Sequence, residues 1–161
     1  MLKLAATNFR LAPPGLTRTK PPSHLHLLPS HERISFLMRR VLIIDDEDDI
    51  REVAALSLEA TAGWQILTAS SGAEGISIAA AEQPDAILMD VMMPGVDGPT
   101  TFSAMQQNPA IARIPVLLLT AKVQGVDQRR FAGLGLAGIL FKPFDPLTLA
   151  EQISEVLGWK D

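Results

Sequence analysis

The chain has 161 residues, 47% of them hydrophobic, and carries a formal net charge of −4 with no cysteine. This length suits one ordinary domain, no apolar run approaches the roughly 20 residues that span a bilayer, and the lack of cysteine excludes disulfides, thiolate zinc sites and cysteine nucleophiles. We therefore expect one soluble domain with no membrane insertion.

The charge is divided unevenly along the chain. Residues 1–37 hold five basic residues and one acid, whereas residues 38–161 hold nine basic residues and 17 acids. An acidic domain binds the negative backbone of nucleic acids poorly, so we expect no nucleic-acid partner. All three histidines also lie before residue 38. Residues 38–161 therefore have no imidazole for a catalytic triad, a zinc site or a phosphohistidine.

Residues 1–37 show no sustained helical or strand periodicity and contain Pro13-Pro14, Pro21-Pro22 and Pro29. This composition is typical of a disordered segment. Two alternatives stay open. The scarcity of acids loosely fits an organelle transit peptide, and Met38 could be the true first residue, which would make residues 1–37 a mis-annotated tail. We place the folded domain at residues 38–161.

From residue 38 onward, short apolar runs alternate with segments of helical spacing. The apolar runs predict five strands, at Val41–Ile44, Trp64–Ala69, Asp85–Asp90, Ile114–Leu119 and Gly138–Phe141. The helical segments lie around Ile50–Leu58 up to Gly63, around Ile76–Ala80 after a Ser70-Ser71 cap, from Gly98-Pro99 to about Gln107, from Val123 to about Gly133, and around Leu149–Leu157 after an Asp145-Pro146 cap.

Five consecutive strand–helix units predict an α/β fold with a doubly wound parallel sheet and helices on both faces. In the third strand, four apolar residues, Ala86 to Met89, run into the acid Asp90, which is typical of a strand buried on both faces. Right-handed crossovers bring the carboxyl ends of all five strands to one edge of the sheet. Ligands of such folds bind at that edge.

The residues that follow the strands are chemically complementary. Asp45 and Asp46 follow the first strand, Asp90 ends the third, Thr120 ends the fourth and Lys142 follows the fifth. Carboxylates about 5 Å apart repel by on the order of 3 kcal/mol per pair at an effective dielectric near 20, so we expect a cation among them. Oxygen ligands without histidine or cysteine favour Mg²⁺. A metal, an ammonium and a hydroxyl around a carboxylate form a site for a phosphoryl group on that carboxylate.

Each of these residues alone has an ordinary explanation. Acids at a helix start are favoured by the helix dipole, which is our interpretation of Asp48 and Asp49, and Asp97 is interpreted as a turn residue. Alone, Thr120 would be a strand-end or cap residue, and Lys142 a solvated lysine. The combination at four strand ends indicates a reaction site.

Four motifs, in this order and spacing, carry a family resemblance: Leu-Ile-Ile-Asp45-Asp46-Glu47, Met-Asp90-Val-Met-Met-Pro-Gly-Val-Asp-Gly98, Leu-Leu-Leu-Thr120-Ala-Lys and Phe-Lys142-Pro-Phe144. Residues 39–160 thereby resemble a response-regulator receiver domain of two-component signalling. The resemblance implies a flavodoxin-like three-layer sandwich with a five-stranded parallel sheet of order 2-1-3-4-5. It also implies a stand-alone receiver that signals through phosphorylation-dependent protein–protein contacts, in the cytoplasm.

Further implications of the resemblance concern single residues. Asp90 would be the phospho-acceptor. Mg²⁺ would be bound by Asp90, directly by Asp46, mainly through water by Asp45, and by the backbone carbonyl of Met92. Thr120 and Lys142 would contact the phosphoryl oxygens, and the Lys142–Pro143 peptide would be cis. The donor would be a histidine of a sensor kinase or of a phosphotransfer protein, which fits the absence of histidine from residues 38–161.

One position departs from the family pattern. Receivers usually carry Tyr or Phe three residues before the lysine, as a rotameric switch, and here that residue is Ile139. Phe141 shares its face of the strand by the two-residue period and could partly substitute for it. The departure concerns how a phosphorylated state is displayed, not the phosphotransfer chemistry.

Two rival functions are weighed against this interpretation. Aspartate-based phosphatases commonly place a second acid two residues after the nucleophile, but here that residue is Met92. A pseudo-receiver scaffold that is never phosphorylated would not need the complete set of Asp45, Asp46, Asp90, Thr120 and Lys142. We therefore expect a signalling phospho-acceptor rather than an enzyme acting on a separate substrate.

Overall fold

Parallel strands separated by helices form the frame of the protein. In this computed structural model the described residues are 38–121 and 131–160, with residues 9, 10, 23, 25–27, 29, 30 and 129. The main strands are β2 (Arg40–Ile44), β3 (Gln65–Ala69), β4 (Ala86–Asp90), β5 (Val116–Thr120) and β6 (Gly138–Phe141), and the helices are α2 (Asp48–Ala62), α3 (Gly72–Glu82), α4 (Gly98–Gln106) and α6 (Leu149–Leu157).

The sheet order is β1-β6-β5-β4-β2-β3, where β1 is the short strand Phe9–Arg10, and the strands β2 to β6 run parallel to one another. Without β1, this is the predicted order 2-1-3-4-5, so the doubly wound fold is confirmed. The helix predicted from Val123 to about Gly133 falls largely outside the described residues.

The amino-terminal segment contributes two short elements for which the sequence gives no periodic signal. Strand β1 (Phe9–Arg10) pairs antiparallel with β6 and so becomes an edge of the sheet, placing Phe9 opposite Ile139. A single 3-10 turn, η1, covers Leu25–Leu27. The domain boundary at residue 38 stays a prediction.

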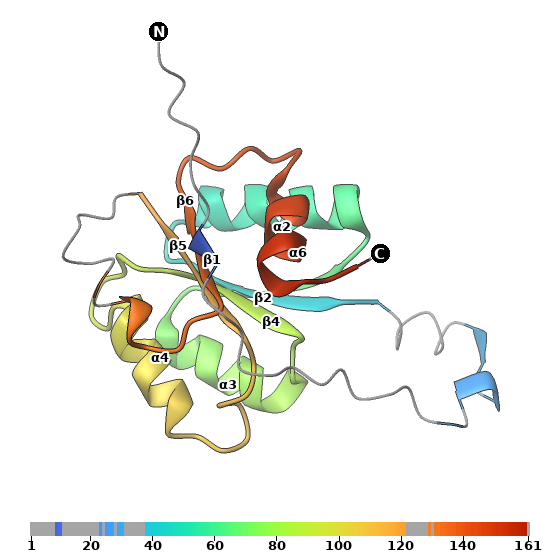
Figure 1. The fold of residues 1–161 in the computed structure, drawn as a ribbon, viewed down its shortest axis with the longest axis horizontal. Coiled ribbons are helices and arrows are strands. Elements are labelled where there is room, and N and C mark those ends of the chain that lie inside the picture. Colours follow the sequence, from blue (N-terminus) through green and yellow to red (C-terminus); the bar gives the residue numbers. More distant parts are fainter. Residues whose placement is uncertain are drawn as a thin grey trace, which may run out of the picture.

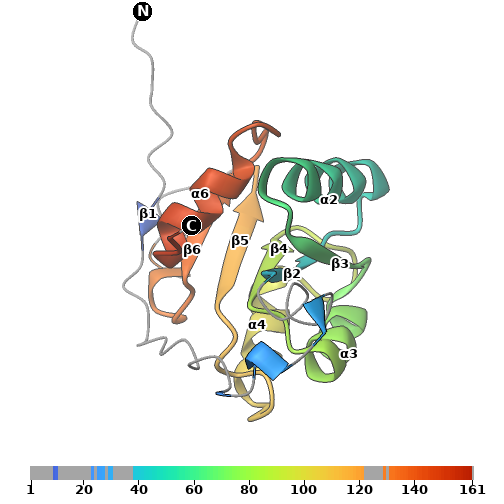
Figure 2. The ribbon, with the colours of Figure 1, turned by 90° about the vertical axis from the view of Figure 1, so that its right-hand side faces the viewer.

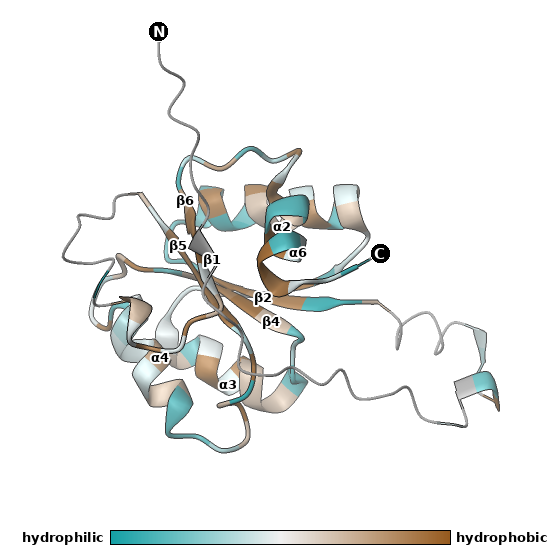
Figure 3. Ribbon diagram, viewed as in Figure 1, coloured by the Kyte–Doolittle hydropathy of each residue, from teal (hydrophilic) through white to brown (hydrophobic). Residues whose placement is uncertain are grey.

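Two helical layers enclose the sheet. Helices α2 and α6 cover one face, and α3 and α4 cover the other (Figures 1 and 2). Side chains alternate between the faces along each strand: in β2, Val41 and Ile43 pack toward α2 and α6, whereas Leu42 and Ile44 pack toward α3 and α4. Figure 3 shows the resulting hydrophobic sheet between more polar outer helix faces. Among the helices that the structure describes, none is both long and apolar enough to cross a membrane.

The helix starts are set by local side-chain bonds. Ser71 accepts a hydrogen bond from the Glu74 amide, while Glu74 accepts one from the Ser70 amide. This resembles a capping box, except that Glu74 reaches the residue before the N-cap. Asp97 is more than the predicted turn residue, because its carboxylate caps α4 by accepting from the Thr100 amide.

The cap predicted for the last helix is wrong in detail. The N-cap of α6 is Thr148, which makes no side-chain capping bond. Asp145 instead closes the turn before the helix, accepting a hydrogen bond from the Leu147 amide at 2.9 Å.

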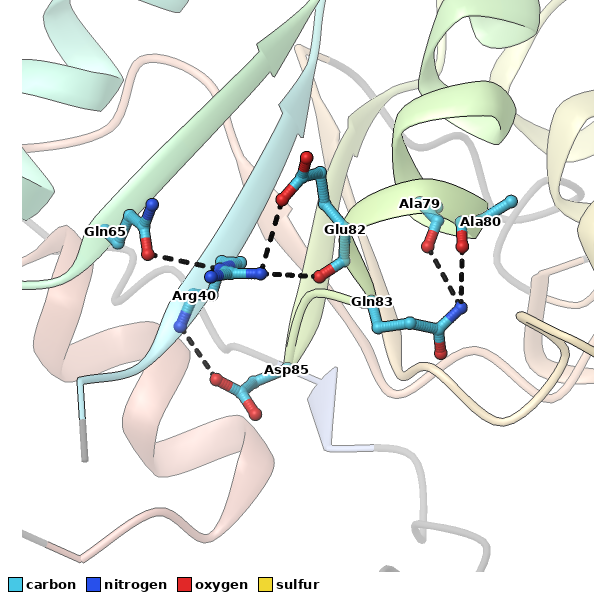
Figure 4. Close-up of polar contacts among 7 residues, drawn as sticks. All are labelled: Arg40, Gln65, Ala79, Ala80, Glu82, Gln83 and Asp85. Atoms are coloured by element: carbon cyan, nitrogen blue, oxygen red, sulfur yellow. Dashed lines mark hydrogen bonds and ion pairs between the residues drawn. The ribbon is translucent and has the colours of Figure 1, made fainter. Parts of the chain in front are cut away.

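At the amino edge of the sheet, Arg40 ties three elements together (Figure 4). Its guanidinium donates to Gln65 at the start of β3 and to the Glu82 carbonyl at the end of α3, and its amide donates to the Asp85 carboxylate. These hydrogen bonds hold the beginnings of β2, β3 and β4 together. They lie at the edge of the sheet opposite the carboxyl ends of the strands.

An aromatic cluster lies close to the same edge. The rings of Trp64 and Trp159 meet edge to face with centroids 5.2 Å apart, and the Arg39 guanidinium lies 4.1 Å from the Trp159 ring centroid. Because Trp159 lies two residues after the end of α6, the cluster anchors the end of that helix to the start of β3.

Candidate functional site

The carboxyl ends of four strands bring the predicted residues to one place. Asp45 directly follows β2, Asp90 and Thr120 are the last residues of β4 and β5, and Lys142 directly follows β6. Asp45, Asp90 and Thr120 are buried. A buried strand can carry a polar residue at little cost only at its end, because the adjacent loop leaves room for partners. The topology therefore delivers these groups to a single edge.

The carboxylates of the site gather closely around a lysine. One oxygen each from Asp45, Asp46 and Asp90 lies within 4.8 Å of the other two. The Lys142 ammonium lies 3.0 Å from Asp45 Oδ2 and 3.4 Å from Asp90 Oδ1, with its side chain only 12% exposed. One cation thus faces three anions, and the site keeps a net negative charge.

Asp46 has a buried carboxylate oxygen that makes no hydrogen bond. Its Oδ1 is the one buried side-chain oxygen without a hydrogen-bond partner among the described residues. A buried, unpaired carboxylate oxygen is costly, and a divalent cation between the three acids would satisfy it. The ligands are all oxygens, so the residues present fit Mg²⁺.

The electrostatics of the site affect the protonation of two groups. Burial raises the pKa of the Asp90 carboxyl, the nearby Asp45 carboxylate raises it further, and Lys142 and the Met92 amide only partly oppose this. Burial alone would lower the pKa of Lys142, but the Asp45 and Asp90 carboxylates outweigh it and raise that pKa above its ordinary value. Lys142 is therefore a fixed positive charge, and an ionised Asp90 is held in an unfavourable environment.

The loop after β4 is folded tightly onto the strand. The Met92 amide donates to Asp90 Oδ1 at 3.4 Å, and the Gly98 amide donates to the Val91 carbonyl at 3.0 Å. A Cβ at Gly98 would clash with the Asp90 carbonyl oxygen, so only glycine permits this approach of α4 to the end of β4. Met92 is 77% exposed.

The loop after β2 and the first turn of α2 each contain a residue whose contacts were not predicted. The Glu47 carboxylate reaches Lys142, with 3.6 Å between Oε1 and Nζ. The Arg51 guanidinium donates to the backbone carbonyl of Asp45 at 2.6 Å and pairs with Asp48. The cluster of acids from 45 to 49 signals this region in the sequence, but which acid turns inward depends on side-chain conformation.

Strand β6 presents the predicted switch position. Ile139 is buried on the α3–α4 side, and the half-buried Phe141 lies on the same side, as the two-residue period predicts. The sheet register places Phe141 opposite Thr120. The Lys142–Pro143 peptide is cis, as the resemblance implies.

Comparison with known proteins agrees with this geometry. Residues 41–154 match the family described as response regulator receiver domain. PilH of Pseudomonas aeruginosa is 35% identical over 121 residues, covering 75% of this chain and 99% of PilH. The transcriptional regulator RpaA of Synechocystis is 37% identical over 124 residues, covering 77% of this chain but only 51% of RpaA, so the chain spans about half the length of that regulator.

Solved structures show the same similarity. The chemotaxis protein CheY4 of Vibrio cholerae superimposes with a TM-score of 0.69 at 31% identity, covering 74% of this chain and 98% of CheY4. A putative response regulator from Chloroflexus aurantiacus gives a TM-score of 0.65 at 35% identity, covering 75% and 98% of the two chains.

Proposed function

The chain belongs to the response-regulator receiver family, and we propose that it accepts a phosphoryl group on Asp90 from a histidine of a kinase or phosphotransfer protein. The observation that carries this proposal is the position of Asp90. It is a buried carboxylate at a strand end, 3.4 Å from the Lys142 ammonium and close to two further acids.

The proposed reaction moves one phosphoryl group between two proteins. An oxygen of the Asp90 carboxylate attacks phosphorus, the phosphorus–nitrogen bond of the donor breaks, and the electron pair of that bond returns to the donor imidazole. The product is an acyl phosphate on Asp90. We assign Lys142 and Thr120 to contacts with the phosphoryl oxygens. Thr120 ends β5 and Lys142 follows β6, and these two strands lie on the same side of β4.

The metal is assigned to the acids. Asp46 would bind Mg²⁺ directly, Asp45 mainly through water, and Asp90 and the Met92 carbonyl would complete the protein ligands. Bound there, Mg²⁺ would neutralise negative charge on the phosphoryl oxygens. Support comes from the unpaired buried Oδ1 of Asp46 and from the oxygen-only ligand set.

The output is assigned to a protein–protein contact that depends on phosphorylation. Movement of Thr120 toward the phosphoryl group would be transmitted along the sheet to β6, where Phe141 lies opposite Thr120. Ile139 occupies the family's switch position but is a buried aliphatic residue. We therefore assign the aromatic part of the switch to Phe141. We likewise assign the domain to the cytoplasm, on the strength of the proposed partnership with a kinase.

The function is tested by intact mass measurement after incubation with acetyl phosphate and Mg²⁺. We expect a labile adduct of one phosphoryl group that is absent from Asp90→Ala. No adduct under saturating donor would favour a pseudo-receiver, and catalytic turnover of a phosphate ester would favour a phosphatase.

A further inference from the structure

Glu47 makes a contact that the proposed reaction does not use. Its Oε1 lies 3.6 Å from the Lys142 ammonium, which gives that ammonium three carboxylate neighbours. Glu47 is the N-cap residue of α2, yet its side chain makes no capping hydrogen bond. The carboxylate is therefore turned toward the site rather than toward the helix it begins.

The three neighbours of Lys142 differ in how easily they can be released. The side chains of Asp45 and Asp90 are 2% and 4% exposed, whereas the Glu47 side chain is 62% exposed. Asp45 is held further, because its Oδ1 accepts a hydrogen bond from the Glu47 amide at 2.9 Å. Glu47 can return to water at little cost, while the two aspartates cannot.

A phosphoryl group arriving on Asp90 needs the same ammonium. A lysine ammonium has three donors, and in the resting protein carboxylates surround it. The contact that gives way is the exposed one, since breaking it leaves no buried charge unpaired. Lys142 stays protonated throughout, so no proton moves in this exchange.

We propose that Glu47 is a positioning residue that competes with the incoming phosphoryl group for the Lys142 ammonium. It keeps Lys142 engaged in the unphosphorylated protein and thereby lowers both the rate of phosphorylation and the affinity for phosphoryl analogues. The inference rests on the proposed phospho-acceptor function. It concerns how readily Asp90 is phosphorylated, not the chemical steps of the reaction.

The test compares three variants of the full chain with the wild type. Glu47→Gln removes the competing charge. Glu47→Asp keeps the charge at the entrance of the site but is one methylene shorter and loses its reach to Lys142. Asp49→Asn removes an exposed acid two residues further along α2 and is the matched control for a general change in charge.

Two quantities are measured, the rate of adduct formation with acetyl phosphate and Mg²⁺, and the dissociation constant of beryllofluoride. For Glu47→Gln and Glu47→Asp we expect about two- to fivefold faster phosphorylation and correspondingly tighter beryllofluoride binding, the range typical of an exposed ion pair. Asp49→Asn should match the wild type, and the melting temperatures should not differ.

The outcomes separate this inference from the proposed function. An adduct on wild-type Asp90 with no acceleration in Glu47→Gln would overturn the role of Glu47 alone. Acceleration in Glu47→Gln but not in Glu47→Asp, or an equal acceleration in Asp49→Asn, would also overturn it, because general repulsion would then be the cause. The absence of any adduct on the wild type would overturn the proposed function and this inference together.

Discussion

Replacing Asp90 with asparagine should stabilise the metal-free protein. One Asp90 oxygen lies within 4.8 Å of an oxygen of each of Asp45 and Asp46, so at an effective dielectric near 20 the ionised Asp90 repels each of them by at least about 3.5 kcal/mol. Its attraction to Lys142 at 3.4 Å offsets about 5 kcal/mol of this. The net penalty of roughly 2 kcal/mol is removed by the neutral side chain, so the free energy of unfolding of Asp90→Asn should exceed that of the wild type by about that amount.

The sign of this effect depends on pH. The pKa of Asp90 is raised above its ordinary value of 3.8 in the folded protein, so the folded state holds its proton more tightly than the unfolded state does. The wild type therefore loses stability as the pH rises from 3.8 through the folded pKa, and the loss is complete above it. Since asparagine does not titrate, the advantage of Asp90→Asn should be full at neutral pH and should vanish once both states are protonated.

Urea denaturation followed by circular dichroism, at several pH values with and without Mg²⁺, measures these differences. Mg²⁺ should stabilise the wild type by mass action and the variant less, because the variant lacks one ligand charge. A variant that is less stable than the wild type at neutral pH without metal would refute the reasoning. It would mean that the Lys142 contact outweighs the carboxylate repulsion.

Three further predictions concern the metal ligand, the amino-terminal segment and the lifetime of the acyl phosphate. Asp46→Asn should abolish phosphorylation while leaving the protein folded and no less stable, because one repulsion is relieved; full Mg²⁺-dependent adduct formation in this variant would show that the ligand assignment is wrong. A chain beginning at Met38 should melt at the same temperature as the full chain, because strand β1 pairs only two residues with β6, and a clear loss of stability would move the domain boundary. Self-dephosphorylation should be slow, because Met92 is apolar and Lys122, which lies outside the described residues, cannot act as a base while protonated. Met92→Asn with Lys122→Glu should speed the decay of purified phosphoprotein, and an unchanged or slower decay in that double variant counts against the explanation.

The sequence predicts that the site residues lie close together, because a parallel sheet with helical crossovers fixes the edge at which each strand ends. Once alternating strands and helices are recognised, Asp45, Asp90, Thr120 and Lys142 must meet at one edge, whatever the loop details. The buried character of β4 was predictable from the residues, since an uninterrupted apolar run has no polar face to expose to water. The strand order was predicted from the family resemblance.

Contacts set by side-chain conformation and by very short elements could not be predicted. Nothing in the spacing distinguishes Glu47, which turns toward Lys142, from Asp48, which pairs with Arg51. Strand β1 has two residues, too few for a periodic signal. The cap of α6 was misplaced because Asp145 forms a turn with the same sequence signature as a helix cap.

The tryptophan pair at the far edge of the sheet has a practical consequence for spectroscopy. Both tryptophans of the chain belong to it, so intrinsic emission comes from one location, remote from the acyl-phosphate chemistry. The tryptophan emission should change in a single transition when α6 unfolds from β3. It should not change when a phosphoryl group is added at the opposite edge. A change in emission on phosphorylation would mean that the conformational change extends across the full length of the sheet. The tryptophan pair would then be an intrinsic fluorescence reporter of that change.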